Sequence, residues 1–397
     1  MRLNRFRLPS YARRVISQLL ITSFVMVLFV PFNGHATSPE RASSRKRVPP
    51  IGPLAGLIEV NTTGDGDNLS PNGGCDVDTT TPGEQCTLRA AIQKANTTAG
   101  DDTIRFNIPL GQPNCSPSGH CAIFLTKELP DLTTNVRIEG PSPNLLTIRR
   151  LSGVDFRLFR VTFATEVTFS GLRLENGRAA GVNSGGAIEG QGPATVNIVD
   201  CVMNENVGGT TASSGGALAN NNAGTMNVVN SVISGNRATV AGGGIVNGGT
   251  GTVNVTGSTI AQNTVTIPAI NTSNGGGGGI ANKSTGTVNV TNSFIVENQV
   301  LGGDPAASIR RGGGLWNAST GAMNITGCVI LNNRATGEGG GVANTTGTLN
   351  VTNSTLTRNR GVGGGIFGQA TVKSSAQTFR AEAKPRPSCQ IVGDAGG

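Results

Sequence analysis

The chain has 397 residues, of which 59 are glycine and only 4% are aromatic, and its formal net charge is +8. So few aromatic residues argue against an ordinary enzyme core, and the lack of a Gly-X-Y period excludes collagen. The hydrophobic fraction of 36% is too high for a disordered chain. The composition instead favours a fold of many tight turns and thin strands.

Residues 1–36 have the pattern of a secretory signal peptide. Five arginines precede the apolar stretch Val15–Phe32, and small residues follow at Gly34 and Ala36. This order predicts export and cleavage after Ala36. Because the apolar stretch is long, an uncleaved anchor is the alternative, and it would be the one contact with a membrane.

Residues 37–56 read as a basic linker that contains proline. The signal segment and this linker hold the excess positive charge, so the remaining chain is close to neutral. The high net charge therefore does not predict nucleic acid as a partner.

Residues 57–125 form a cysteine-containing region ahead of the repeats. An exported chain permits disulfides, and closeness in sequence pairs Cys75 with Cys86 and Cys115 with Cys121. Zinc is the alternative, but His120 is the one histidine outside the signal segment, and alone it is a poor zinc ligand set. No metal or cofactor is predicted.

A short amphipathic helix is predicted directly after Cys86. Leu88, Ala91, Ile92 and Ala95 recur at helical spacing, which gives the helix one apolar face. A solenoid would expose its core at its first coil, so we expect this helix to cap that end.

The sequence repeats between residues 126 and 375. Each copy has a glycine run ending in an aliphatic residue, then a strand of the TVNVT type and a piece of the STIAQN type. The aliphatic residues are Ile188, Leu218, Ile245, Ile280, Leu315, Val342 and Ile366. Pieces this short cannot form independent sheets, so the copies must stack. We predict an all-β fold, a right-handed parallel β-helix (β-solenoid) of about eight to ten three-sided coils.

Stacking turns each repeated position into a column. Val253, Val255 and Ile260, with their equivalents in other copies, are expected to face the core. Two asparagine columns are expected at corners, where stacked amides can bond coil to coil and asparagine tolerates left-handed backbone. One column is Asn206, Asn236, Asn263, Asn298, Asn333 and Asn359, and the other is Asn220, Asn247, Asn282, Asn317 and Asn344. Both are interpreted as structural.

The segment CTLRAAI, Cys86–Ile92, resembles the CSLREA signature of exported bacterial proteins, with Thr87 and Ala90 departing from it. The later GGAI runs and spaced asparagines are similar to the right-handed parallel β-helix repeats of polymorphic outer-membrane proteins and related adhesin-like proteins. The resemblance covers about residues 57–372. It implies this fold, export and a surface or extracellular location, and it defines no activity.

The regular strand offers a first candidate binding surface. Its outward residues form rows of hydroxyls and amides, represented by Thr252, Asn254, Thr256, Thr287, Asn289 and Thr291. The rows predict a flat face for glycan or, alternatively, for ice. The structural alternative is that strand propensity and amide stacking alone select threonine and asparagine there.

A second candidate surface lies at one corner, where two neighbouring coils carry insertions. Long loops on a regular scaffold often hold functional residues. The candidates are Asp304, Arg310, Arg311 and Trp316. Trp316 follows an inward leucine and is expected to face outward, where it can stack on a sugar ring; packing under its own loop is the alternative.

Two kinds of catalytic site can be compared with the sequence. The run GGGIANKS, Gly277–Ser284, approaches a phosphate-binding loop, but Asn282 replaces a required glycine and a strand follows instead of a helix. Polysaccharide lyases and glycoside hydrolases of the pectin-lyase-like type need paired or Ca²⁺-binding carboxylates. The six acids between residues 180 and 368 form no obvious pair, so no catalytic residue is predicted.

The sequence therefore predicts an exported, non-catalytic, adhesin-like protein at the cell surface or outside the cell. Its expected partner is polysaccharide or another surface component, and a carbohydrate-active enzyme is the alternative. Residues 376–397 are expected to form an irregular tail, either disordered or closing the last coil through Cys389.

Overall fold

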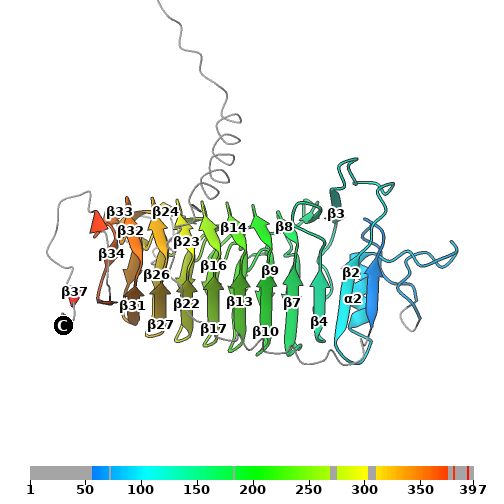
Figure 1. The fold of residues 1–397 in the computed structure, drawn as a ribbon, viewed down its shortest axis with the longest axis horizontal. Coiled ribbons are helices and arrows are strands. Elements are labelled where there is room, and N and C mark those ends of the chain that lie inside the picture. The colour runs from blue at the N-terminus through cyan, green and yellow to red at the C-terminus, as the bar shows by residue number, and fades with distance from the viewer. Residues whose placement is uncertain are drawn as a thin grey trace, which may run out of the picture. The chain divides into compact units, whose positions relative to one another are not determined.

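The computed structural model describes residues 56–70, 73–181, 184–268, 275–302 and 310–373, and the backbone of 379–380 and 391–392. The predicted signal peptide, nearly all of the linker and Cys389 lie outside these residues. The described chain forms four parallel sheets, and in the three largest the strands follow one another in chain order along the stack (Figure 1).

The three main sheets correspond to the three apolar pieces of each sequence repeat. Sheet A contains β1 (Leu57–Val60), β2 (Asp102–Phe106), β4 (Val136–Glu139), β7 (Glu166–Ser170), β10 (Thr195–Val199), β13 (Thr225–Val229), β17 (Thr252–Thr256), β22 (Thr287–Thr291), β27 (Ala322–Thr326), β31 (Thr348–Thr352), β35 (Ala370–Lys373) and β37 (Ile391–Val392). Sheet B contains β3 (Cys121–Leu125), β5 (Leu146–Arg150), β8 (Arg173–Glu175), β11 (Val202–Asn204), β14 (Val232–Ser234), β18 (Thr259–Ala261), β23 (Phe294–Val296), β28 (Val329–Leu331), β32 (Thr355–Thr357) and β36 (Phe379–Arg380). Sheet C contains β6 (Phe159–Val161), β9 (Ile188–Gly190), β12 (Leu218–Asn220), β16 (Ile245–Asn247), β21 (Ile280–Asn282), β26 (Leu315–Asn317), β30 (Val342–Asn344) and β34 (Ile366–Phe367).

This arrangement confirms the predicted parallel β-helix. The three sheets have twelve, ten and eight strands, and each strand pairs with the equivalent strand of the next copy, for example Val253 with Val288 and Val255 with Val290. The predicted inward columns are fully buried, since Val253, Val255 and Ile260 each expose 0% of their surface. Repetition places an apolar residue at the equivalent inward position of each coil, so one continuous core runs through the stack.

A fourth sheet, sheet D, was not predicted. It contains β15 (Arg237–Ala238), β19 (Thr264–Ile267), β24 (Gln299–Gly302), β29 (Arg334–Glu338), β25 (Arg310–Arg311) and β20 (Gly275–Gly276), and β33 (Arg360–Val362) pairs with β29. Parts of the corner insertions thus form strands. Val265, Val300 and Ala335 share a small separate core, which stabilises the extra sheet.

Glycines make the corner that begins each repeat. Gly277 has φ +64°, and an added Cβ there would collide with the carbonyl oxygen of Ile280. The equivalent glycines, Gly185, Gly215, Gly242, Gly312, Gly339 and Gly363, also have positive φ. Left-handed backbone combined with so close an approach excludes any side chain.

Both predicted asparagine columns are hydrogen-bonded ladders in the interior. Asn236 Nδ2 donates to Asn263 Oδ1 at 2.9 Å, and Asn263 Nδ2 donates to Asn298 Oδ1 at 3.0 Å. In the second ladder Asn247 Nδ2 donates to Asn282 Oδ1 at 3.1 Å. These amides are buried, and the same side chains also bond backbone groups at the corners. The ladders therefore give hydrogen-bond partners to buried amide and backbone groups, which would be destabilising in the core without them.

The N-terminal region contains α2 (Leu88–Ala95), the one helix of the described residues, beside β1 and β2 (Figure 1). Thr87 caps it by accepting a hydrogen bond from the Ala90 N–H. The predicted apolar residues Leu88, Ala91, Ile92 and Ala95 are buried in the common core. The predicted disulfides Cys75–Cys86 and Cys115–Cys121 are both formed.

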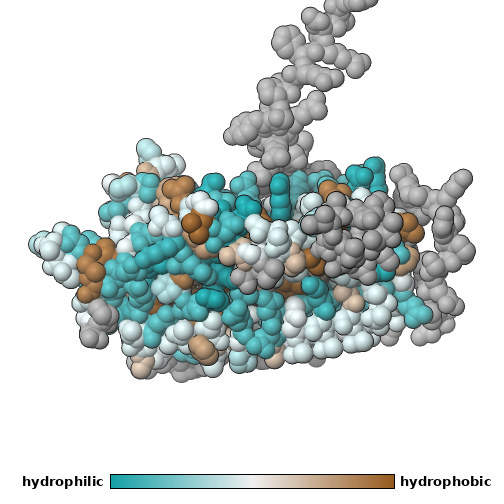
Figure 2. Space-filling view, turned by 180° about the vertical axis from the view of Figure 1, so that it is seen from behind, coloured by the Kyte–Doolittle hydropathy of each residue, from teal (hydrophilic) through white to brown (hydrophobic). Residues whose placement is uncertain are grey.

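One face of the molecule, as far as its residues are described, lacks a large apolar patch. Seen from behind, it is mostly hydrophilic to neutral, with small separate hydrophobic spots (Figure 2). A surface of this kind directs attention to polar groups as the means of recognition.

Candidate binding face

The outer face of sheet A carries the predicted rows of threonine and asparagine. The register pairs Thr252 with Thr287, Asn254 with Asn289 and Thr256 with Thr291. All six side chains are partly or fully exposed, whereas the valines between them are buried. Because neighbouring strands lie ~4.8 Å apart, like groups repeat at that interval along the stack.

The asparagines of this face form a third ladder. Asn254 Nδ2 donates to Asn227 Oδ1, and Asn289 Nδ2 donates to Asn254 Oδ1, each at 2.8 Å. The ladder runs from Asn350 through Asn324 to Asn197. From Asn350 to Asn227, each amide of the ladder keeps a second N–H, and its oxygen keeps a lone pair. The asparagines are thus held rigidly in the face, and with the threonine hydroxyls they can still bond a ligand.

The face is electrically neutral over six consecutive strands, β10 to β31. Their outward side chains are threonine, asparagine, valine and alanine, and none of them titrates between pH 3 and 12. Uncharged donors and acceptors on a flat, rigid support suit an uncharged polyhydroxylated ligand better than an ionic one.

The candidate loop residues do not converge in the same way. Arg310 and Arg311 form β25; Arg310 is buried, and Arg311 Nε donates to Glu338 Oε2 at 2.7 Å. Asp304 lies outside the described residues. Both arginines are therefore part of sheet D, and Arg311 forms a local ion pair with Glu338.

Trp316 lies on the outer side of sheet C but is only 5% exposed. It packs in a small cluster with Ala281, Val246 and Ala343, and its Nε1 donates to Thr345 Oγ1 at 2.9 Å. Its ring is thus packed against neighbouring strands of sheet C and is not displayed for stacking on a sugar. The alternative of packing under its own loop concerns residues outside those described.

Two acidic residues of the repeats, Glu189 and Glu297, are engaged in local contacts. Glu189 is buried, forms an ion pair with Arg157 and accepts a hydrogen bond from Asn221 Nδ2 at 2.7 Å. Glu297 accepts from Gln262 Nε2 at 3.0 Å. Within the described residues, no group of three or more His, Cys, Asp or Glu side chains could hold a metal ion.

Two free thiols lie inside the stack, at Cys201 and Cys328. Each occupies a column otherwise held by serine, and the Cys201 N–H donates to Ser231 Oγ at 3.1 Å. Burial raises the pKa of the Cys201 thiol to about 11 and also raises the pKa of Cys328. Both thiols stay protonated at neutral pH, so they act as packing groups instead of nucleophiles.

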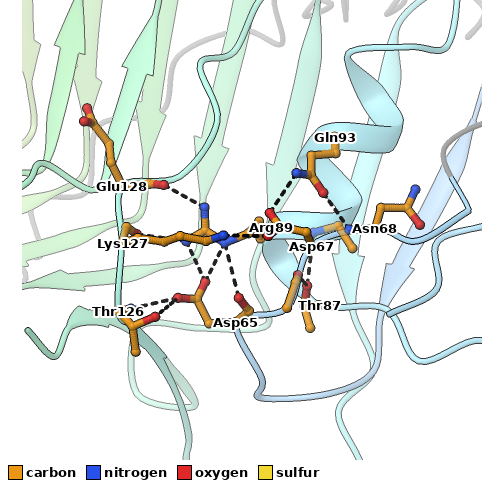
Figure 3. A network of polar contacts seen from close by, with 11 residues as sticks. Asp65, Asp67, Asn68, Thr87, Arg89, Gln93, Thr126, Lys127 and Glu128 are labelled. Atoms are coloured by element: carbon orange, nitrogen blue, oxygen red, sulfur yellow. Dashed lines mark hydrogen bonds and ion pairs between the residues drawn. The ribbon is translucent and has the colours of Figure 1, made fainter. Parts of the chain in front are cut away.

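A buried ion pair joins the signature-like segment to the start of sheet B (Figure 3). The Arg89 guanidinium donates to Asp65 Oδ1 at 2.7 and 2.9 Å and to the backbone oxygens of Lys127 and Glu128 at 2.8 and 2.6 Å. Asp65 Oδ2 accepts from the N–H and hydroxyl of Thr126. The charged groups of Arg89 and Asp65 are hydrogen-bonded to each other and to neighbouring protein groups, which indicates a structural role.

A polar pocket on the outer face of sheet B was missed by sequence reasoning. It has a volume of about 430 Å³ and is lined by His120, Phe124, Thr147, Arg149, Arg173 and Glu175, with Ala122, Pro143 and Asn144. Its residues come from three separate copies of the coil. The sequence signal that could have found it is the charge at outward positions of LTIRR and LRLEN, where later copies carry uncharged residues.

Among the described residues, no helix is long and apolar enough to cross a bilayer. No family model matches the chain, and no curated protein or solved structure was found to match it.

Proposed function

We propose that this chain is an exported surface or extracellular protein that binds a neutral polysaccharide on the outer face of sheet A. The observation that carries the proposal is the neutral, in-register array of threonine and asparagine on six neighbouring strands. Ordered donors and acceptors on a rigid support lose little conformational entropy on binding.

The spacing of the array supports an extended glycan as ligand. Strands repeat every ~4.8 Å along the stack, which is similar to the length of one sugar ring in an extended chain. A glycan that runs along the stack can therefore meet one Thr–Asn–Thr row per ring. Many weak contacts of this kind add up because the rows are continuous.

Export is supported by two separate features. The two disulfides suggest an oxidising environment outside the cytoplasm. The signal-like residues 1–36 and the resemblance of CTLRAAI to the CSLREA signature add to this proposal. Adhesin-like binding follows from the same resemblance and from the polar face.

The test is a glycan array probed with the purified protein and two matched pairs of substitutions. Thr252→Lys with Thr287→Lys places two cations on the sheet A face. Thr259→Lys with Thr355→Lys makes the same change at outward positions of sheet B. We expect the first pair to weaken binding at least tenfold and the second to leave it unchanged. Equal binding by both double variants would refute the proposal.

The same incubation separates binding from catalysis. After exposure to the glycans that bind, the sugars are analysed for shortened or unsaturated products. Retention of intact glycan is expected. Product release that survives the sheet A substitutions would instead favour the carbohydrate-active enzyme as the function.

A further inference from the structure

We propose that the pocket on sheet B is a second, separate binding site, selective for a carboxylated sugar such as a uronate. The pocket spans β3, β5 and β8, the first three strands of that sheet. Its volume of about 430 Å³ lies within the range of small-molecule sites. It shares no residue with the sheet A face, so the two proposals stand or fall separately.

The charge of the pocket favours an anion. Arg149 and Arg173 share one carboxylate, Glu175, at N–O distances of 3.6 and 3.5 Å. These distances exceed the ~2.7–2.9 Å of a strong charge-assisted hydrogen bond. Arg173 is further positioned by a 2.9 Å bond from its Nε to the Pro143 carbonyl. The three groups leave one net positive charge and several N–H donors available for an incoming carboxylate.

The other lining groups suit a sugar ring. Phe124 is half-buried and stands beside Arg149 in the register, so an apolar ring face adjoins a cation. The Thr147 hydroxyl is buried and lies 2.9 Å from His120 Nε2. A ring can therefore pack on Phe124 while its hydroxyls bond Thr147 or His120 and its carboxylate meets the arginines.

The pocket is held rigidly before any ligand arrives. The Cys115–Cys121 disulfide closes the loop that carries His120. Within that loop the Ser116 N–H donates to the His120 carbonyl at 2.7 Å, and the His120 N–H donates to Ser116 Oγ at 3.2 Å. A preformed site of this kind avoids the entropy cost of ordering on binding.

The charged set is confined to the pocket coils. Along sheet B, Arg173 is followed in register by Val202 and Val232. Glu175 is followed by Asn204 and Ser234. The stack itself therefore needs no charge at these positions, and the arginines and glutamate require an explanation specific to the pocket.

The test uses His120 as a reporter in the full chain. The chain has two histidines, so in a His35→Ala background the Hε1 proton of His120 gives a single histidine Hε1 signal in the NMR spectrum. It is titrated with D-glucuronate, D-glucose and inorganic sulfate. We expect a saturable shift with glucuronate and at least tenfold weaker binding of the other two. A shift of equal affinity with glucose or with sulfate, or none with glucuronate, would overturn the proposal.

Substitutions test the assignment of charges. Arg149→Gln is expected to weaken glucuronate binding at least tenfold. Glu175→Gln removes the competing carboxylate and is expected to strengthen it severalfold, a gain that misfolding cannot produce. Arg105→Gln, an exposed arginine on sheet A paired with Glu139, is the control and should have no effect. A loss of affinity with Glu175→Gln would contradict the proposed roles.

Discussion

The side-chain amide of Asn197 donates to Glu166 Oε1 at 3.0 Å, so the outer asparagine ladder ends on a carboxylate. Every link in this ladder points toward the N-terminal coils, and the acceptor at its end carries a full negative charge. In the first interior ladder the donors point the opposite way, as in Asn206 Nδ2 to Asn236 Oδ1 at 3.0 Å. Both ladders consist of amide–amide hydrogen bonds, but one is buried and the other is partly exposed. This difference should determine how much stability is lost when one amide is removed.

Removal of one interior amide should be far more destabilising than removal of one outer amide. Asn263 is fully buried and its side chain takes part in four hydrogen bonds, so Asn263→Ala leaves several buried groups without partners. We expect a loss of about 3 kcal/mol or more, because each orphaned group costs ~1–3 kcal/mol. Asn254→Ala exposes its neighbours to water and should cost about 1 kcal/mol or less. Urea unfolding of both variants is the measurement, and equal losses would contradict this account.

The cost in stability of replacing a corner glycine by alanine should depend on the atoms that surround the added Cβ. Gly277→Ala brings a Cβ against the Ile280 carbonyl, whereas Gly235 has φ +66° and open space around its Cβ position. Gly235→Ala should therefore cost only the ~1–2 kcal/mol of left-handed backbone. Gly277→Ala should cost clearly more, since the backbone must also move.

Gly235→Asn provides the matched control for this pair. Asn176 and Asn332 occupy the equivalent corner with φ 55° and 56°, so asparagine should be tolerated at residue 235. Thermal unfolding ranks the three variants. The reverse order, with Gly235→Ala the most damaging, would show that contact with Ile280 does not matter.

Asp102 should make the fold more stable in mild acid than at neutral pH. It occupies the inward column continued by Val136 and Val167, and both its carboxylate oxygens are buried without hydrogen-bond partners. Burial raises the pKa of Asp102 from 3.8 to about 6. The folded state thus binds the proton more tightly than the unfolded state, and its stability rises as pH falls from about 6 toward 4.

Replacement of Asp102 should remove this pH dependence. Asp102→Asn and Asp102→Val are expected to raise the free energy of unfolding at pH 7 by roughly 2 kcal/mol, in line with the pKa shift. Both should also remove the increase in the free energy of unfolding that the wild-type protein shows as pH falls from 6 to 4. Asp101→Asn, at the exposed neighbouring position, removes a charge that makes only a minor contribution to the raised pKa of Asp102, so this variant should keep most of the wild-type pH dependence. Chemical unfolding at several pH values measures the effect, and a wild-type profile retained in Asp102→Val would disprove it.

The Arg89–Asp65 pair should be essential to the stability of the N-terminal region, although burial of its two charges carries a desolvation cost. Arg89→Ala leaves the buried Asp65 carboxylate uncompensated and should cost about 3–5 kcal/mol. The double change Arg89→Met with Asp65→Leu removes both charges and should recover much of that loss. Limited proteolysis within residues 57–125 reports the result. A double variant as labile as Arg89→Ala would indicate that the hydrogen bonds to Lys127 and Glu128 matter more than the charge pair.

The sequence by itself determined the repeating part of the molecule. A column such as Val253, Val288 and Met323 recurs at every coil, and parallel stacking is the one arrangement that buries each member on its neighbour. The asparagine ladders and corner glycines follow from the same repetition. The two disulfides followed from closeness in sequence, and the apolar face of α2 from its helical spacing.

Only the tertiary structure decided what happens where the repetition breaks. The corner insertions add sheet D, and packing covers Trp316, because residues distant in sequence meet around it. The pocket at His120 unites side chains from three coils whose spacing is irregular. Asp102 has a raised pKa because it is buried in an inward column that continues with Val136 and Val167. Each of these features depends on contacts between non-equivalent positions, and periodicity carries no information about such contacts.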